Sequence, residues 1–340
     1  MKESEFAVGV DIGGTNTAVG VVDHTEVCRF TSSFSTKGER TAEKFIFTLA
    51  STISELCAKV DGNINLRGIA IAAPAATRHE GRIQSPANLQ WGTIDIVNML
   101  KKYYTIPIVV TNDSNAGALG EMKHGLAKGM KNFVVITIGS GLGAGIVVDG
   151  RLIYGENGVA GELGHTTIDP GGRMCGCKRR GCVETYVSAK GICRTVFELL
   201  ARSTEETELR EISYNRLTAE KVHALAIHGD PIANEAFEIT GKLLGQMLSN
   251  TVASFDPEAI ILSGGLMHAG DLLLGPTVKS FNEHLLALHK NRVSIVKSQM
   301  KDGEAAILGA ISLIGEFGEK KQGTPQWRPG TSLGKETVTT

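Results

Sequence analysis

Four side chains between residues 165 and 182 have the types and the spacing of a closed zinc site. His165 stands ten residues before Cys175, and Cys177 and Cys182 follow closely. One imidazole and three thiolates complete the tetrahedral shell of a structural Zn²⁺ and leave no position for water, so we expect the metal to support the fold rather than to act as the catalyst. The remaining thiols are expected to be ordinary small buried side chains: Cys28, Cys57 and Cys193.

Two glutamates flank this cluster and would be held rigidly by it. Glu162 precedes His165 by three residues, and Glu184 follows Cys182 by two. A zinc-bound imidazole keeps a second ring N–H that can donate to a ligand hydroxyl, and each carboxylate can accept from hydroxyls. The group therefore suits a polyhydroxylated substrate, whereas either glutamate taken alone is equally compatible with a plain surface charge.

Two glycine-bearing turns have the composition of phosphate-holding loops. In the first, Asp11-Ile-Gly-Gly-Thr15, backbone N–H groups can approach an anion while a hydroxyl and a carboxylate serve phosphate and its cation. Alone, this turn is equally an ordinary hairpin connection. The second, Gly139-Ser-Gly-Leu-Gly-Ala-Gly145, has glycine at alternate positions of a strand-like run. Facing each other across a cleft, the two turns could hold a triphosphate, with Asp11 suited to Mg²⁺ and Thr137 in its place in the second copy.

Asp113 lies where a predicted strand over 106–112 gives way to a helix. In α/β proteins the carboxyl ends of strands carry functional side chains, which favours a role in chemistry. Aspartate is also a favoured helix N-cap, so a purely structural role competes with this interpretation. Asn112 and Asn115 make the cluster denser in polar groups than one cap requires.

These residues need strands and helices to bring them together, and the hydrophobic pattern predicts both. Strands are expected over 6–12, 17–23, 68–74, 106–112 and 259–265, and helices over 41–60, 93–102, 185–202, 231–254 and 303–316. Residues 8–23 align with 134–149 without a gap, and seven of the sixteen positions are identical. Since only two copies occur, we expect two related α/β domains with a boundary near 115–131.

Composition narrows the functional class. The 340 residues carry 35 Lys and Arg against 36 Asp and Glu, so no global field draws the chain to nucleic acid or an anionic membrane. No window is apolar enough to span a membrane and the start does not resemble a signal peptide, so a cytoplasmic protein is expected. Glycine is in excess, at 41 residues, and we expect the excess where backbone approaches phosphate, nucleoside, zinc or sugar.

Together these motifs resemble the ROK family of sugar kinases and sugar-responsive repressors. The matching segments are DIGGT at 11–15, NDSNA at 112–116, GELGH at 161–165, CGCKRRGCVE at 175–184 and SGG at 263–265. The resemblance implies two actin-like (ribonuclease H-like) ATPase domains with a cleft between them. We place the domains at 1–118 and 119–302, with the zinc loop over 165–182, a closing helix that packs back on the first domain, and a tail over 317–340.

The resemblance also implies residue roles. Asp113 corresponds to the catalytic base, and Asn112, Asp113, Glu162, His165 and Glu184 correspond to partners of the sugar hydroxyls. His165, Cys175, Cys177 and Cys182 correspond to the zinc ligands. ATP and its Mg²⁺ would be bound by residues of both turns and of a third glycine pair: Asp11, Gly13, Gly14, Thr15, Asn16, Thr137, Gly139, Ser140, Gly141, Gly143, Gly264 and Gly265.

The implied activity is ATP-dependent phosphorylation of a hexose at its 6-hydroxyl, with glucose as the expected sugar. An N-acetylhexosamine or fructose kinase is the alternative within the family. A regulator is disfavoured because only about five residues precede the first strand, too few for a DNA-reading helix. An actin-like filament subunit would leave the zinc block without a role. We expect a homodimer, as in the family.

Two departures from the family pattern are visible. Lys178 follows the second cysteine of the block, where glycine is usual, and Pro74-Ala75 stands where Pro-Gly is common near the sugar. Neither change removes a predicted ligand, but each alters the backbone freedom at its position.

Overall fold

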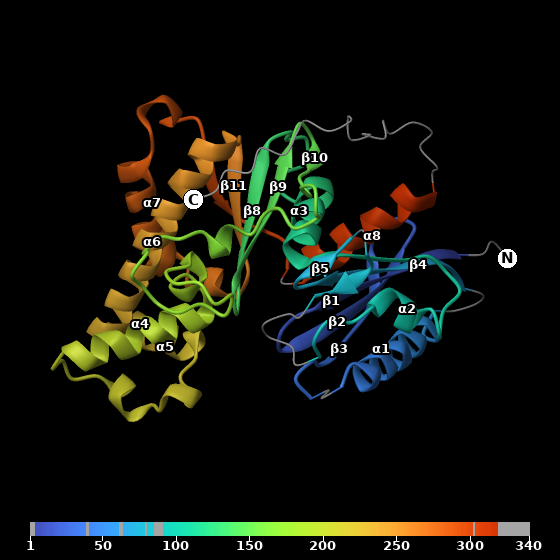
Figure 1. Cartoon of the computed structure of the whole chain (residues 1–340), viewed down its shortest axis with the longest axis horizontal. Helices are drawn as coiled ribbons and strands as arrows, with labels where there is room; N and C mark the ends of the chain where they lie inside the picture. Colours follow the sequence, from blue (N-terminus) through green and yellow to red (C-terminus); the bar gives the residue numbers. More distant parts are fainter. Residues whose placement is uncertain are drawn as a thin grey trace, which may run out of the picture.

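Two five-stranded sheets lie side by side, and two helices pass between them (Figure 1). The computed structural model describes residues 4–38, 41–60, 64–78, 80–84, 91–301 and 303–318. Of the predicted tail, residues 319–340 lie outside this described part. None of the helices within it is long and apolar enough to cross a membrane.

The first sheet has the strand order β3-β2-β1-β4-β7. Its strands are β1 (Ser4–Ile12), β2 (Asn16–Asp23), β3 (Cys28–Ser35), β4 (Ile64–Ala73) and β7 (Ile108–Asn112). β1 pairs antiparallel with β2 and parallel with β4. Helix α1 (Ala42–Cys57) covers one face with a buried stripe at helical spacing, which includes Phe45, Leu49 and Ile53, and Thr41 caps its start.

The second sheet has the order β10-β9-β8-β11-β12. Its strands are β8 (Phe133–Ile138), β9 (Leu142–Val148), β10 (Arg151–Leu152), β11 (Ala259–Ser263) and β12 (Ser294–Lys297). Helices α4 (Ala189–Arg202), α5 (Ala219–Ile227), α6 (Pro231–Phe255) and α7 (Asp271–His284) form one large core with this sheet. The remaining short elements are β5 (Ala76–Thr77), β6 (Arg82–Ile83), α2 (Ile96–Leu100), η1 (Leu163–His165), η2 (Val183–Thr185), η3 (Glu208–Glu211), η4 (Tyr214–Arg216), η5 (Gly265–Ala269) and η6 (Ala287–His289).

The predicted internal repeat is confirmed by the sheet topology, with one difference in register. Each sheet consists of three antiparallel strands followed by two parallel ones, in the same spatial order. Ile12 pairs with Thr17, whereas Ile138 pairs with Leu142, so the second hairpin loop is one residue shorter. The second strands of the two hairpins, β2 and β9, therefore correspond with a shift of one residue relative to the ungapped alignment. Without this shift, the alignment would match residues that face opposite sides of the sheet.

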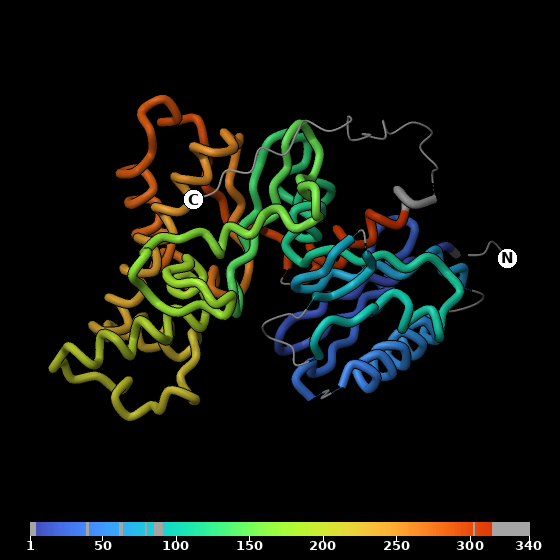
Figure 2. Tube along the Cα trace, in the orientation of Figure 1, coloured from blue at the N-terminus to red at the C-terminus, as the bar shows by residue number. Residues whose placement is uncertain are grey.

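Helices α3 (Asp113–His124) and α8 (Glu304–Gly318) pack against each other between the sheets. The chain crosses from the first sheet to the second after α3 and returns before α8 (Figure 2). Their close approach requires glycine: a Cβ at Gly120 would lie 2.1 Å from the Ala305 carbonyl oxygen, and one at Gly309 would lie 1.8 Å from that of Ala116. α8 also packs on β4 and β1. The domain boundary at residue 118 stays a prediction.

Several elements differ from the sequence prediction. The helix expected over 93–102 contracts to α2, and the strands β3 and β12 and the helices α5 and α7 were not predicted. β3 alternates half-buried and exposed positions and is rich in serine, so its pattern is weak. α7 contains Pro276, which normally argues against a helix interior.

Candidate active site

The predicted zinc ligands come together in the structure. The ligand atoms of His165, Cys175, Cys177 and Cys182 all lie within 4.8 Å of one another. Two of these separations are 3.6 Å, between the sulfurs of Cys177 and Cys182 and between the Cys175 sulfur and His165 Nδ1. A tetrahedral Zn²⁺ with ordinary bond lengths places two sulfurs about 3.8 Å apart, and sulfur and nitrogen about 3.6 Å apart. The four residues therefore fit a zinc ion, and this group is called the metal cluster below.

The ligands are carried by a short ribbon after η1. Residues 167 and 182 form one isolated bridge and residues 174 and 180 another, and the Cys175 N–H donates to the Arg179 carbonyl at 2.8 Å. Lys178 sits at the turn with φ 69°, the left-handed conformation that glycine adopts most readily. The replacement of the usual glycine by Lys178 therefore preserves the ribbon, but the lysine has to adopt a backbone conformation that glycine favours.

His165 presents its two ring nitrogens to different neighbours. Nδ1 lies beside the Cys175 sulfur, and Nε2 lies 3.8 Å from a carboxylate oxygen of Glu162. If Nδ1 binds the metal, Nε2 carries the N–H and is free to donate. The arrangement fits the sequence interpretation of His165 as a link between the metal cluster and a hydroxylated ligand.

Asp113 begins α3, but it is not the N-cap. Asn112 occupies that position, and its side-chain oxygen accepts from the backbone N–H groups of Ser114 at 2.9 Å and Asn115 at 3.4 Å. The interpretation of Asp113 as a simple cap is therefore wrong, because Asn112 caps the helix. The capping engages the oxygen of Asn112, so any contact of this residue with a sugar would have to use its amide nitrogen.

Four carboxylates from separate segments act on one another electrostatically. Burial raises the pKa of Asp11 to about 7, with a further contribution from the charge of Asp113. Burial also raises the pKa of Asp113, against hydrogen bonds from Ser114 that lower it, and the charge of Glu184 adds to the rise. For Glu162, burial raises the pKa, His165 lowers it, and Asp113 and Glu184 raise it further. Glu162 keeps 56% of its side chain exposed, so solvent screens its share of the effect.

Glu184 connects the metal cluster to the second glycine turn. One of its carboxylate oxygens accepts from the Leu142 N–H at 3.0 Å, and a Cβ at Gly141 would lie 2.3 Å from the same oxygen. The glycine at 141 is thus required for the close approach of Glu184. The contact fixes the carboxylate beside the tip of the β8–β9 hairpin.

The glycines of the predicted phosphate sites have different environments. A Cβ at Gly139 or Gly265 would meet nothing within 4 Å, so backbone is open there. Gly264 has φ 93° and lies against the Ile138 backbone. A Cβ at Gly143 would strike the Ser114 hydroxyl at 1.9 Å, so this glycine serves the packing of α3 on β9, and a phosphate contact there stays a prediction. In the first turn, the Gly13 N–H donates to the Asn16 carbonyl at 3.0 Å.

Ala75, the second departure from the family pattern, is also in the left-handed region, with φ 53°. Its carbonyl accepts from the Gln84 N–H at 3.0 Å, which holds the turn between β4 and the short β5–β6 hairpin. Both departures therefore occupy backbone conformations in which a side chain is strained.

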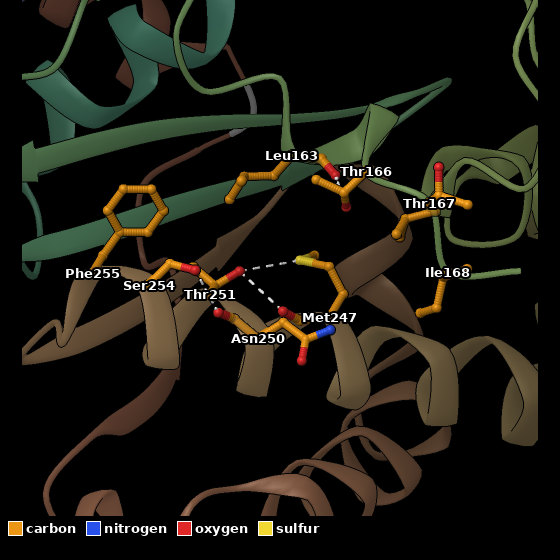
Figure 3. A pocket seen from close by; sticks show the side chains of 10 residues that line it. Leu163, Thr166, Thr167, Ile168, Met247, Asn250, Thr251, Ser254 and Phe255 are labelled. Carbon is orange, nitrogen blue, oxygen red and sulfur yellow. Dashed lines mark hydrogen bonds between the residues drawn. The ribbon is translucent and has the colours of Figure 1, made fainter. Parts of the chain in front are cut away.

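A cavity of about 110 Å³ lies between η1, the residues that follow it and α6 (Figure 3). The Thr251 hydroxyl donates to the Met247 carbonyl at its wall. The lining residues include none of the predicted catalytic, phosphate or metal residues: Leu163, Thr166, Thr167, Ile168, Val183, Met247, Asn250, Thr251, Ser254 and Phe255. The cavity is therefore distinct from the candidate active site.

Sequence reasoning missed two residues that support the site. Ser114 donates to Asp113 through its hydroxyl at 3.3 Å and through its backbone N–H at 2.8 Å. Arg173 is buried beneath the ribbon of the metal cluster. An arginine two positions before a metal ligand carries no motif of its own, and only its burial singles it out.

A model of the ROK family matches residues 7–316 of the chain. The chain belongs to the ROK family. A glucokinase of Streptomyces coelicolor is 33% identical over 315 residues, which are 92% of this chain and 98% of that protein. A xylose repressor of Bacillus subtilis is 26% identical over 317 residues, 92% of this chain and 78% of that protein.

This ROK protein is also similar to solved structures. The crystal structure of a ROK family glucokinase from Streptomyces griseus in complex with glucose and AMPPNP superposes with a TM-score of 0.80 at 29% identity, covering 91% of this chain and 98% of that one. A ROK hexokinase from Thermus thermophilus superposes with a TM-score of 0.75 at 26% identity, covering 90% and 96%. These likenesses confirm the predicted α/β fold of the actin-like ATPase class.

Proposed function

We propose that this ROK protein transfers the γ-phosphoryl group of ATP to the 6-hydroxyl of a hexose, with glucose as the preferred sugar. The observation that carries the proposal is the position of Asp113, the first residue of α3, whose carboxylate is not the helix cap and lies within electrostatic reach of Asp11, Glu162 and Glu184. The similarity to glucokinases, one of them in complex with glucose and AMPPNP, supports the choice of substrates.

Asp113 is proposed as the general base. Its raised pKa strengthens it as a proton acceptor compared with an ordinary aspartate, and at neutral pH it takes the proton of the attacking hydroxyl. The N–H and the hydroxyl of Ser114 both donate to one of its oxygens and so orient the carboxylate. Positioning of this kind is the main contribution a protein makes to phosphoryl transfer.

Glu162, His165 and Glu184 are proposed to bind the sugar hydroxyls. The carboxylates accept and His165 Nε2 donates, so the set can distinguish the orientation of neighbouring hydroxyls. We propose that a structural zinc ion in the metal cluster helps to keep these three side chains in place. Because Glu184 also accepts from Leu142, its carboxylate is held beside the tip of the second turn.

The two hairpin turns are proposed to bind ATP, with Gly264 and Gly265 near the nucleoside. Gly139 and Gly265 leave backbone open to a ligand, in agreement with this role. Asp11 fits a Mg²⁺ site, since a half-buried carboxylate that feels the charge of a second one favours the uptake of a cation. Mg²⁺ would neutralise charge on the transferred phosphate.

A panel of steady-state assays tests the proposal. kcat/KM would be measured with ATP for glucose, fructose, N-acetylglucosamine and N-acetylmannosamine, and with polyphosphate as an alternative donor for the best sugar. The proposal requires glucose to exceed the other sugars by about tenfold or more, which corresponds to about 1.4 kcal/mol. A higher value for an N-acetylhexosamine or fructose would assign the alternative substrate, and the absence of turnover with all four would reject the kinase.

A sugar-responsive regulator is the second candidate, because a xylose repressor is among the similar proteins. This candidate predicts sugar binding in calorimetry without ATP turnover.

Light scattering in the presence of ATP tests the proposed homodimer. A closed dimer supports the proposal, whereas ATP-dependent growth of polymers would indicate a filament.

A further inference from the structure

Arg173 is a buried cation whose donors are all satisfied by protein. Only 6% of its side chain is exposed. Nε donates to Glu198 at 2.8 Å, and Nη2 donates to Glu198 at 2.5 Å and to the Thr195 hydroxyl at 2.9 Å. Nη1 donates to the carbonyls of Thr185 at 2.7 Å and Gly191 at 3.1 Å. These contacts account for all five N–H groups of the guanidinium.

The contacts of Arg173 join three segments. Its backbone belongs to the ribbon of the metal cluster, where its carbonyl accepts from the Gly181 N–H at 2.9 Å. Its side chain reaches the carbonyl of Thr185 in η2 and the first turns of α4, and its guanidinium lies 4.2 Å from the centre of the Tyr186 ring. The Tyr186 hydroxyl accepts from the Arg173 N–H and donates to Asp169 of the same ribbon.

A metal ion alone would not fix all of the proposed sugar-binding residues. It would tie together four ligands between 165 and 182, but Glu184 lies beyond the last of them. Arg173 donates to the carbonyl of Thr185, the residue after Glu184, and so holds Glu184 in a fixed position relative to the ribbon. Burying a guanidinium is costly unless every donor is paired, and here every donor is used to join these segments.

We propose that Arg173 is a positioning residue that fixes Glu184 and the ribbon of the metal cluster relative to each other, so that it controls both sugar binding and metal retention. The sugar part rests on the proposed function, whereas the metal part does not. Since all of its donors are paired within the protein, Arg173 would act through Thr185, the ribbon and α4 and not by binding sugar or ATP itself.

The test compares Arg173→Ala and Arg173→Lys with two controls. Lysine keeps the charge but has three donors in place of five, so it should restore part of the function. Arg180→Ala removes an exposed arginine of the same ribbon, whose guanidinium donates to the Gly172 carbonyl at 3.2 Å. Val222→Ala removes buried volume from the same core, on α5 and outside the ribbon.

Three quantities are measured for each variant: the rate of zinc release to a colorimetric chelator, the KM for the hexose and the KM for ATP. We expect Arg173→Ala to release zinc about 10- to 100-fold faster and to raise the hexose KM by a similar factor, as for other residues that support metal ligands. The KM for ATP should stay within about threefold, and both controls should behave like the wild type in zinc release and hexose KM.

Wild-type zinc release and hexose KM in Arg173→Ala would overturn the proposal. So would equal rises of both KM values, or the same changes in Val222→Ala, since these would indicate general destabilisation. If Arg173→Ala does not fold, Arg173→Lys and Glu198→Gln decide: a few-fold change in the same direction supports the proposal, and wild-type values in both reject it. If the wild type phosphorylates no hexose, the proposed function fails, and zinc release still tests the positioning role.

Discussion

Replacing Asp11 by asparagine should stabilise the protein at neutral and alkaline pH while it impairs catalysis. Burial and the neighbouring charge of Asp113 raise the pKa of Asp11 from 3.8 to about 7. The folded state therefore binds this proton more tightly than the unfolded chain, and stability falls as the pH rises between these two values. A pKa rise of about 3 corresponds to at most about 4 kcal/mol, and partial solvent access reduces this to about 1–3 kcal/mol.

The assay is thermal unfolding between pH 5 and pH 8 without added Mg²⁺. The Tm of Asp11→Asn should exceed that of the wild type at pH 8, and the difference should shrink toward pH 5, where Asp11 of the wild type is protonated. Added Mg²⁺ should narrow the difference at pH 8, since only the wild type gains a ligand for the cation. Asp149→Asn is the control, because Asp149 is exposed and its φ of 51° suits asparagine. A Tm difference that does not change with pH, or a lower Tm of Asp11→Asn at pH 8, would refute the reasoning.

Three further predictions concern other parts of the molecule. Purified protein should contain about one Zn²⁺ per chain, and Cys182→Ser should lose it together with thermal stability; a zinc-free wild type that is folded and active would contradict the metal cluster. Ser298→Ala should lower the free energy of unfolding by about 1–3 kcal/mol, because the Ser298 hydroxyl donates to the buried carboxylate of Glu121, which also accepts from the Leu126 N–H. Ser312→Ala on α8 is the matched control, and an equal effect of the two in urea unfolding would argue against a special role of Glu121. Ala75→Gly and Lys178→Gly should each raise the Tm, because both residues have a positive φ that strains a side chain by about 1–2 kcal/mol. This relief exceeds the free-energy cost of the added entropy of glycine in the unfolded chain. A lower Tm of both variants would show that the strain is not significant.

The metal cluster and the repeat could be predicted from the sequence because their signals are local. The metal ligands lie within eighteen positions of the chain, so their spacing alone restricts the chemistry. The two hairpins repeat the same alternation of apolar residues and glycine, and each forms the start of its own sheet. The one-residue difference between the loops escaped the ungapped alignment, because glycine-rich turns tolerate a change of length.

Glycine also serves contacts between distant segments, which the sequence interpretation of its excess did not include. Gly120 and Gly309 let α3 and α8 cross closely, and Gly143 accommodates Ser114. Such contacts join residues far apart in the chain, and single-residue composition does not encode them. The sequence left a capping role for Asp113 open for a similar reason, since Asn112 and Asp113 are both good caps and only the observed hydrogen bonds distinguish them.

Arg173 illustrates the limit of sequence reasoning most clearly. Basic residues near a cysteine block are expected on a solvated surface, and Arg179 and Arg180 are indeed exposed. Arg173 is buried because the carbonyls of Thr185 and Gly191 and the side chains of Thr195 and Glu198 converge on it. This convergence depends on the packing of α4 against the ribbon, which no local pattern reveals.

The turnover of Asp113→Asn with ATP and the best hexose tests the central claim most directly. Asparagine keeps the size of the side chain but cannot accept the proton of the sugar hydroxyl, so kcat should fall by about 10²–10⁴. The affinity for the sugar, measured by calorimetry, should change by less than about tenfold. A kcat near the wild-type value in a folded, sugar-binding variant would contradict the assignment of Asp113 as the base.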